Sequence, residues 1–289
     1  MPSNLALTVA PITPDEFVIA PAVMRNIRHA TQTILARGTY TNPDGVDISI
    51  DALQASARTK QRRYDATQPI DVTGGRYGHS QLYVYNQTAL TIARERVRQG
   101  YRVAMLHFVN PPYLQSANSV RPSQADSLMW SSSLAYCLQD VEWQGVSPFY
   151  DDTVVVTPQM PFFRDHGGDL LSEPWRSSVV HAVAIDAHAV RTQMPEHTAE
   201  VPQLMVQRAI RVLQAAATTR ANVLVLGAWG CGCAGHDAAV MAAIWHVAIA
   251  QAKVRIFGII DFAVADIKPS RPTFTSFYQQ LHQQYIALT

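Results

Sequence analysis

Residues 223–251 read VLVLGAWGCGCAGHDAAVMAAIWHVAIAQ, and this stretch decides the fold. A run of aliphatic residues predicts a buried β-strand, a glycine-rich segment follows it, and an alanine-rich apolar stretch then predicts a helix. Asp237 has the side chain preferred at a helix N-cap. Strand, glycine-rich turn and helix in this order indicate an α/β sheet, with a turn whose backbone N–H groups suit an anion such as a phosphate or diphosphate.

The glycine spacing separates this turn from two common nucleotide-binding motifs. Gly227, Gly230, Gly232 and Gly235 fit neither G-x-G-x-x-G nor G-x-x-x-x-G-K-[ST]. Glycine tolerates positive φ and lets a ligand approach the backbone closely, and we expect Gly232 to be such a position. The alternative is an irregular strand-to-helix turn without a ligand. Two thiols in a C-x-C pair make a poor zinc site, and the ten histidines form no H-E-x-x-H motif, so we predict no metal and no cofactor.

Strands and helices alternate along the rest of the chain, which predicts a sheet with helices on both faces. We expect one domain over residues 1–289, with an N-terminal elaboration at 1–75 and a core at 76–289. Predicted strands are SQLYVYN (80–86), VAMLHFVN (103–110), TVVVTP (153–158), SSVVHAVAI (177–185), NVLVLGA (222–228) and VRIFGIIDFAVA (254–265). Predicted helices cover 21–37, 89–100, 127–138, 201–217, 238–252 and 274–286.

Composition restricts the class of protein. The 289 residues are 48% hydrophobic and 16% charged, which is typical of a globular chain. Lys+Arg is 23 and Asp+Glu is 22, so we expect no broad basic face for DNA or RNA, although a local patch remains open. We expect no signal peptide, because the first residues lack a basic segment followed by a long apolar run, and no apolar run reaches the roughly 18 residues that a membrane span needs. Three cysteines are too few for a disulfide framework, and we expect a cytoplasmic protein without membrane contact.

Several stretches together resemble one known family. LVLGAWGCGCAGHD (224–237) resembles the GAWGCGxFGND loop of the microbial-type poly(ADP-ribose) glycohydrolase-like macrodomains. NQTALTIARERVRQGYRVAMLHFVN (86–110), TPQMPFFRDHGGDLL (157–171) and FAV (262–264) resemble three other segments of that family. The resemblance implies a macrodomain-like, three-layer α/β/α fold with a mixed central sheet and an N-terminal helical extension. It also implies ADP-ribose, or an ADP-ribosylated protein, as the binding partner.

The catalytic motif departs from the family pattern. Active members have Gly-Gly-Gly after the strand and then Gln-Glu-Glu at the start of a helix, whereas this chain has Asn-Pro-Pro-Tyr at 110–113 and Gln124-Ala125-Asp126. Asp126 matches the family's catalytic glutamate but is one methylene shorter, about 1.5 Å of reach. Asp126 is interpreted as an acid/base or ribose-orienting carboxylate, as a binding residue in an inactive hydrolase, or as a first-turn helix acid.

Other candidate residues surround this motif. Asn118 and Asp261 complete the predicted catalytic set, although Asn118 also suits a turn and Asp261, inside an apolar strand, also suits a structural role in which it needs partners if buried. Phe262 is predicted to stack on adenine or to pack in the core. Ala234 replaces a phenylalanine that is usual in the family loop. The resemblance implies that these residues contact ADP-ribose: Asn110, Gln124, Gly227, Trp229, Gly230, Cys231, Gly232, Cys233, Ala234, Gly235 and Phe262.

These features predict an ADP-ribosyl hydrolase that removes mono-ADP-ribose from a modified protein. Macrodomains similar to this family that use aspartates include hydrolases of ADP-ribosylated arginine, so the resemblance favours an arginine linkage. The lost triglycine argues against cleavage of poly(ADP-ribose). Two alternatives remain open: a non-catalytic reader of ADP-ribose, and a hydrolase of a small ADP-ribose derivative.

Overall fold

The computed structural model describes residues 6–14, 19–72, 74–75, 77–111, 123–143, 145–252, 254 and 256–287. Its helices are α2 (Pro21–Arg37), α3 (Asp51–Thr59), α4 (Ala89–Arg98), α5 (Gln124–Ser131), α6 (Leu134–Leu138), α7 (Ala187–Gln193), the 3-10 helix η2 (Pro195–Glu200), α8 (Val201–Ala217), α9 (Ala238–Gln251) and α10 (Pro272–Leu281). Its strands are β1 (Thr39–Thr41), β2 (Asp47–Ser49), β3 (Arg62–Tyr64), β4 (His79–Tyr85), β5 (Val103–Val109), β6 (Val154–Arg164), β7 (Leu170–Val183), β8 (Val223–Leu226), β9 (Ile259–Ala263) and β10 (Tyr285–Ala287).

Eight of the described strands form one mixed sheet in the order β10-β4-β9-β8-β5-β7-β6-β3. The five central strands from β4 to β7 are parallel, while β10, β6 and β3 pair antiparallel with their neighbours. A parallel strand covered on both faces needs a continuous apolar run, and every residue of β8 and β9 is buried. The predicted mixed α/β sheet is confirmed.

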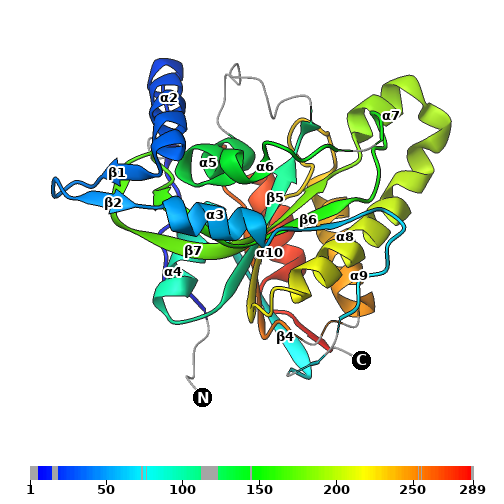
Figure 1. Cartoon of the computed structure of the whole chain (residues 1–289). Coiled ribbons are helices and arrows are strands. Elements are labelled where there is room, and N and C mark those ends of the chain that lie inside the picture. The colour runs from blue at the N-terminus through cyan, green and yellow to red at the C-terminus, as the bar shows by residue number, and fades with distance from the viewer. Residues whose placement is uncertain are drawn as a thin grey trace.

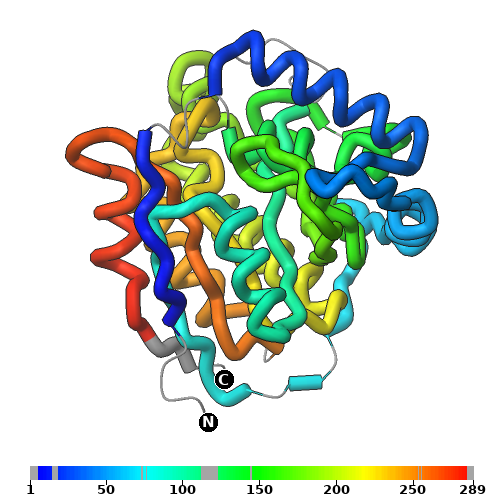
Figure 2. Tube along the Cα trace, turned by 90° about the vertical axis from the view of Figure 1, so that its left-hand side faces the viewer, coloured from blue at the N-terminus to red at the C-terminus, as the bar shows by residue number. Residues whose placement is uncertain are grey.

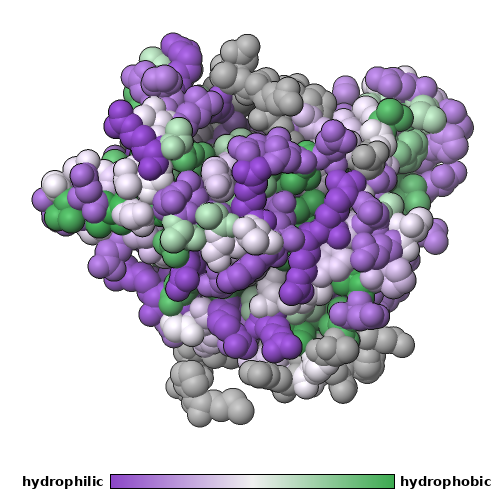
Figure 3. Space-filling model, viewed as in Figure 1, coloured by the Kyte–Doolittle hydropathy of each residue, from purple (hydrophilic) through white to green (hydrophobic). Residues whose placement is uncertain are grey.

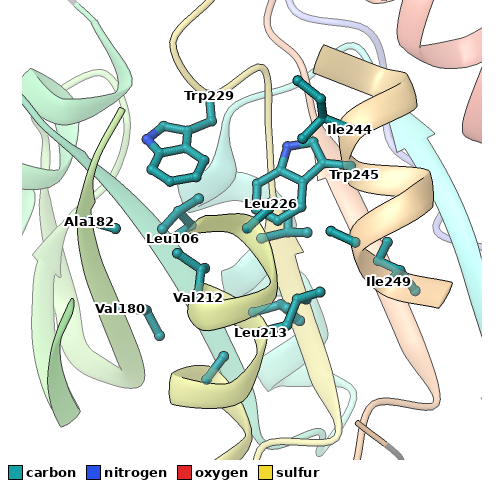
Figure 4. Close-up of a cluster of buried hydrophobic side chains, with 14 of the residues drawn as sticks. Leu106, Val180, Ala182, Val212, Leu213, Leu226, Trp229, Ile244, Trp245 and Ile249 are labelled. Carbon is teal, nitrogen blue, oxygen red and sulfur yellow. The ribbon is translucent and has the colours of Figure 1, made fainter. Parts of the chain in front are cut away.

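Helices cover both faces of the sheet and make three layers (Figure 1). On one face, α8, α9 and α10 pack against a core that includes Leu106, Leu226, Trp229 and Trp245. Figure 4 shows α8 and α9 turning their apolar side chains toward the strands of this layer. On the other face, α3, α4, α5 and α6 cover a second cluster of buried side chains. The face drawn in Figure 3 carries mainly hydrophilic side chains, with hydrophobic ones in small groups between them.

The N-terminal residues are part of the same body rather than an appendage. Residues 6–14 run beside β4 and α4 (Figure 2), and the Leu7 N–H donates to the Tyr85 hydroxyl at 2.8 Å. Helix α2 ends at Arg37 and is followed by the C-cap Gly38 with φ 70°, and the helix lies beside α5 (Figure 1). The predicted elaboration at 1–75 also supplies β3 as an edge strand of the main sheet. Among the described helices, none is long and apolar enough to cross a membrane.

Two predicted helices were wrong in part, and one pair of strands was predicted too short. The helix predicted at 127–138 is two helices, because the backbone of Ser132 forms a bridge to Phe162 between them. The strands predicted at 153–158 and 177–185 are parts of one long β6–β7 hairpin that continues past Pro158 and Pro161 by irregular pairing. The end of the helix predicted at 274–286 is β10, which pairs with β4.

Parallel strands place their carboxyl ends at one edge of a sheet, and ligands of α/β folds bind outside such edges. Strands β5, β8 and β9 are neighbours in this arrangement. The segments that follow them begin at Asn110, Gly227 and Val264, so the sheet brings the motifs of three distant stretches of sequence together.

Candidate functional site

Gly227 is where the glycine loop leaves the sheet, and its neighbours leave no space for a side chain. A Cβ on Gly227 would lie 2.8 Å from the Ala263 carbonyl oxygen, 3.1 Å from the Phe108 ring and 3.2 Å from Gln124 Oε1. Gln124 opens α5 and also donates from Nε2 to the Leu106 carbonyl at 3.3 Å. Close packing therefore seats the start of the loop against the start of α5.

The loop folds back on itself through four backbone hydrogen bonds. The N–H groups of 229, 231, 235 and 236 donate to the carbonyls of 227, 228, 232 and 230 at 2.8–3.1 Å. Within the described residues, the N–H groups of Gly232, Cys233 and Ala234 have no acceptor in the protein. Gly232 and Cys233 are exposed, and Ala234 is half-buried. Three successive unpaired N–H groups are the donors that an anion such as a diphosphate needs.

Helix α7 fixes the far side of this loop. The His188 N–H donates to the Ala234 carbonyl and Arg191 Nη2 donates to the Gly235 carbonyl, both at 3.0 Å. His236 Nε2 donates to the Ile185 carbonyl at 2.8 Å, which requires a proton on this nitrogen. Burial lowers the pKa of His236, so its ring is neutral at pH 7. Nothing in the sequence pattern connected α7 with the glycine loop.

Gly230, rather than Gly232, is the glycine whose conformation the loop requires. Gly230 has φ 76°, and a Cβ there would lie 2.5 Å from His236 Cδ2. Gly232 lies outside the left-handed region, and a Cβ there would meet no atom within 4 Å. The prediction that Gly232 needs positive φ was wrong. Gly232 instead leaves open space beside the three unpaired N–H groups.

Two predicted ligand contacts lie in the core. Trp229 and Phe262 are both fully buried, at 0% exposure. Trp229 packs on Trp245 with ring centroids 5.8 Å apart (Figure 4), and Phe262 packs between Trp245 and Phe277. Neither ring is accessible to a ligand in this structure, so the predicted adenine stacking on Phe262 is replaced by core packing.

Asp237 is the N-cap of α9, as predicted. Its Oδ1 accepts from the Ala239 and Val240 N–H groups at 2.9 Å. This carboxylate already satisfies the first turn of α9 and places a negative charge there. The exposed N–H groups of the loop, not the helix end, are therefore the donors open to an anion.

The two thiols of the loop differ in environment. Cys233 is exposed, and its Sγ accepts from Asn110 Nδ2 at 3.1 Å, which connects the end of β5 with the loop. Cys231 is half-buried, and burial raises the pKa of its thiol to about 12. Cys231 is thus a neutral packing residue at physiological pH. Among the residues that the structure describes, no group of three or more His, Cys, Asp or Glu side chains is placed to hold a metal ion.

Asp126 is the third residue of α5, where both of its oxygens are bound. Oδ2 accepts from the Ser123 N–H at 3.0 Å and from the Ser123 hydroxyl at 2.8 Å, while the Asp126 N–H donates to the same hydroxyl. This arrangement is a capping box. The interpretation of Asp126 as a first-turn helix acid is therefore correct as far as local structure goes, and any chemical role is additional. Asn118 lies outside the described residues.

Arg28 of α2 pairs with the other oxygen of Asp126. Arg28 Nη2 lies 2.5 Å from Asp126 Oδ1, and the side chains are 18% and 19% exposed. Arg28 shares one helix face with the buried residues Met24, Thr31 and Leu35. The helical spacing of these residues could have shown that Arg28 faces the protein. It could not have identified Asp126, which is 98 residues away along the chain, as the partner.

Asp261 is a structural residue rather than a catalytic acid. It lies in the middle of β9 at 0% exposure, and its two oxygens accept from Arg96 Nε and Nη2 at 2.7 and 2.9 Å. Burial raises the pKa of Asp261, and the guanidinium of Arg96 acts in the opposite direction. A bidentate pair sealed from solvent cannot reach a substrate, which corrects the prediction of Asp261 as a second acid.

A buried histidine pair lies in adjacent strands β5 and β7. His107 and His181 are in register, and their Nδ1 atoms are 3.0 Å apart. His181 Nε2 lies 2.9 Å from the Thr157 hydroxyl, which accepts from Gln61 Nε2 at 2.8 Å. Burial lowers the pKa of His107 to about 3 and that of His181 well below its ordinary value. Both rings are neutral in the folded protein.

These histidines predict acid sensitivity. Each is neutral when folded but protonates near its ordinary pKa of about 6.5 when unfolded. Below that pH the unfolded chain binds more protons, so the free energy of unfolding should fall by about 1.4 kcal/mol per pH unit for each histidine. Urea titrations between about pH 7 and pH 5 test this slope, because few carboxylates titrate there. A free energy of unfolding that is constant across this window would contradict the neutral buried pair.

Known proteins with a similar sequence or a similar fold belong to one family. A family model described as "Microbial-type PARG, catalytic domain" matches residues 29–165. The structure of poly(ADP-ribose) glycohydrolase from Thermomonospora curvata is similar, with a TM-score of 0.80 and 28% identity over 89% of this chain and 98% of that one. The expected resemblance to the microbial-type poly(ADP-ribose) glycohydrolases is confirmed.

Two further structures carry ligands. The Thermomonospora curvata enzyme bound to the inhibitor ADP-HPD gives a TM-score of 0.78 and 29% identity, over 89% of this chain and 98% of that one. Poly(ADP-ribose) glycohydrolase from Deinococcus radiodurans in complex with ADP-ribose gives a TM-score of 0.69 and 29% identity, over 78% of this chain and 96% of that one. A search of curated protein sequences returned no match.

Proposed function

We propose that this chain binds an ADP-ribosyl group at the carboxyl edge of β5 and β8 and hydrolyses its glycosidic bond. One observation carries the proposal: three N–H groups of exposed or half-buried residues, without an acceptor among the described residues, lie on the same edge as a carboxylate. The contact of Gly227 with Gln124 joins the loop to the helix turn that holds Asp126. The loop would hold the diphosphate, and the distal ribose would extend toward Asp126. Ligands in the two similar structures support ADP-ribose as the group bound.

Asp126 suits a base or an orienting group better than an acid. Its carboxylate forms an ion pair with Arg28 and accepts hydrogen bonds from Ser123, so every contact in this structure uses it as an acceptor. An oxocarbenium-like centre at the anomeric carbon is stabilised by a nearby negative charge. We propose that Asp126 orients the attacking water and accepts its proton as the new C–O bond forms. This role is one of those expected for Asp126 from the sequence, as an acid/base or ribose-orienting carboxylate.

This assignment favours an arginine linkage. When the anomeric C–N bond of an ADP-ribosylated arginine breaks, the electron pair goes to a guanidinium that is already cationic. The departing nitrogen then takes up the proton that the carboxylate received from water, so atoms and charge balance without a separate acid. Asp126 Oδ1 already accepts a hydrogen bond from the Arg28 guanidinium at 2.5 Å. A substrate arginine would make the same kind of contact.

A reader function is the second candidate, and the same contact supports it. Both oxygens of Asp126 are already bound, and Ala125 replaces the neighbouring family glutamate. If Arg28 and Ser123 keep these positions when ADP-ribose binds, the carboxylate cannot move toward the anomeric carbon. The chain would then bind the ADP-ribosyl group without cleaving it.

The test is a substrate panel with one linkage varied at a time. Proteins ADP-ribosylated on arginine, serine or glutamate, and poly(ADP-ribose) chains, are incubated with the full chain, and free ADP-ribose is quantified by mass spectrometry. We expect release from the arginine-linked protein and little from poly(ADP-ribose). Binding of ADP-ribose without release from any substrate would contradict the hydrolase and leave the reader.

A further inference from the structure

A cavity of about 230 Å³ lies between α4 and the turn of the β6–β7 hairpin. Its lining combines two kinds of side chain. The polar part comes from Arg94, Glu95, Arg98 and the 164–166 turn, while Val9, Leu90 and Trp175 supply the apolar wall. The volume is just below the range usual for ligand sites, so the cavity suits a small ligand or one part of a larger one.

Arg164 is the buried cation of this cavity. The residue is only 6% exposed, with Nε donating to the Thr31 hydroxyl at 3.1 Å and Nη1 to the Gly168 carbonyl at 2.8 Å. Both acceptors are neutral, and in the described part of the chain no carboxylate lies within ion-pair distance of this guanidinium. Burial lowers the pKa of Arg164. The carboxylates of Asp169 and Asp165 offset part of the cost of burying this charge from beyond ion-pair distance, and an anion in the cavity would contact the guanidinium directly.

Two further arginines add to the same charge. Arg94 and Arg98 are one helical turn apart on α4 and both line the cavity. Neither forms an ion pair with any described residue. The lining also includes two carboxylates, Glu95 and Asp165, but Asp165 Oδ1 already accepts the Asp169 N–H at 3.0 Å within the hairpin turn. Three guanidinium groups against two carboxylates leave the cavity positive.

Trp175 supplies the aromatic part of the cavity lining. Its indole Nε1 is buried and has no acceptor among the described residues. One face of its ring stacks on Phe162, with centroids 4.4 Å apart. The Nε1 atoms of Trp130, Trp143, Trp229 and Trp245 are likewise buried without an acceptor among the described residues, so Trp175 contributes its ring to the cavity rather than a free donor.

We propose that this cavity binds the phosphate group of an organic phosphate, with the guanidinium groups of Arg94, Arg98 and Arg164 holding the oxygens and Leu90 and Trp175 contacting the organic part. This cavity is separate from the proposed ADP-ribose site that contains Asp126. Helix α5 lies between them: Asp126 is in its first turn, and Ser131 at its end donates to the Asp165 carbonyl at 3.0 Å. This inference does not depend on hydrolase activity.

The test follows the Trp175 indole signal in ¹H–¹⁵N spectra of the full chain, assigned by its loss in Trp175→Phe. Inorganic phosphate, pyrophosphate and AMP are titrated separately. We expect a saturable shift of this signal, with AMP binding more tightly than inorganic phosphate because its organic part contacts the apolar wall. In the Arg94→Ser/Arg98→Ser variant the Kd should rise about ten-fold or more, since each charged hydrogen bond contributes on that order.

Arg62→Ser is the matched control, because Arg62 is an exposed arginine on the edge strand β3. It should leave every titration unchanged, and thermal melts should show that both variants fold. A Trp175 signal that stays still at millimolar ligand, or an equal Kd in the double variant, would overturn the site. AMP binding no tighter than inorganic phosphate would overturn the assignment of an organic phosphate.

Discussion

Asp126→Asn is expected to slow release of ADP-ribose about 100-fold or more, because a positioned base contributes at least that factor. Asparagine keeps the shape of the side chain and an oxygen that can still accept from Ser123. It removes the negative charge that faces the anomeric carbon and the proton acceptor for water. Calorimetry should show ADP-ribose binding changed only a few-fold, since the loop N–H groups remain.

Two control variants separate chemistry from helix capping. Ser123→Ala breaks the capping box but keeps the carboxylate. It should lower the free energy of unfolding by about 1 kcal/mol, and it should slow ADP-ribose release less than Asp126→Asn does. Asp126→Glu restores the family residue but moves the carboxyl about 1.5 Å, and we expect it to lose activity rather than gain poly(ADP-ribose) cleavage. If Asp126→Asn kept full turnover on every linkage, Asp126 would not be the base.

Gly232→Val is expected to abolish detectable ADP-ribose binding while leaving the melting temperature unchanged. A Cβ at Gly232 meets no protein atom within 4 Å, so the free protein tolerates the side chain. The same side chain would project beside the unpaired N–H groups of 232–234 and occupy the space that the diphosphate requires. Thermal melts and calorimetry on one preparation test both halves of the prediction.

Gly230→Val is the matched comparison. Gly230 has φ 76°, and its Cβ would contact His236 at 2.5 Å, so this variant should lose stability as well as binding. Loss of both properties in Gly230→Val and of binding alone in Gly232→Val would identify the loop as the anion site. Wild-type affinity in a folded Gly232→Val protein would make the loop purely structural.

The sequence predicted the layers of the fold well because long apolar runs and helical periodicity determine them. Helices α2 and α8 begin and end at the predicted residues, and Asp237 is the N-cap that its residue type indicates. The errors occur where tertiary pairing overrides local pattern. The β6–β7 hairpin continues through two prolines, and β10 forms only because β4 offers an open edge.

The site was predicted only in outline. The motif named Gln124, Gly227 and the loop as ligand contacts, and in the structure Gln124 lies against Gly227. Sequence could not show that Phe262 and Asp261 point into the core, because a strand in a covered sheet is apolar on both faces. Nor could it show Arg28 at Asp126 or α7 at the loop, since each contact joins segments that are distant along the chain.

The central claim is that this edge cleaves a glycosidic bond with Asp126, and one rate comparison tests it most directly. The initial rate of ADP-ribose release from an arginine-ADP-ribosylated protein is measured for the wild-type chain and for Asp126→Asn side by side. The account predicts clear release by the wild type. The rate of the variant should be lower by a factor of about 100 or more. Equal rates, or a wild-type chain that binds ADP-ribose but leaves the bond intact, would contradict it.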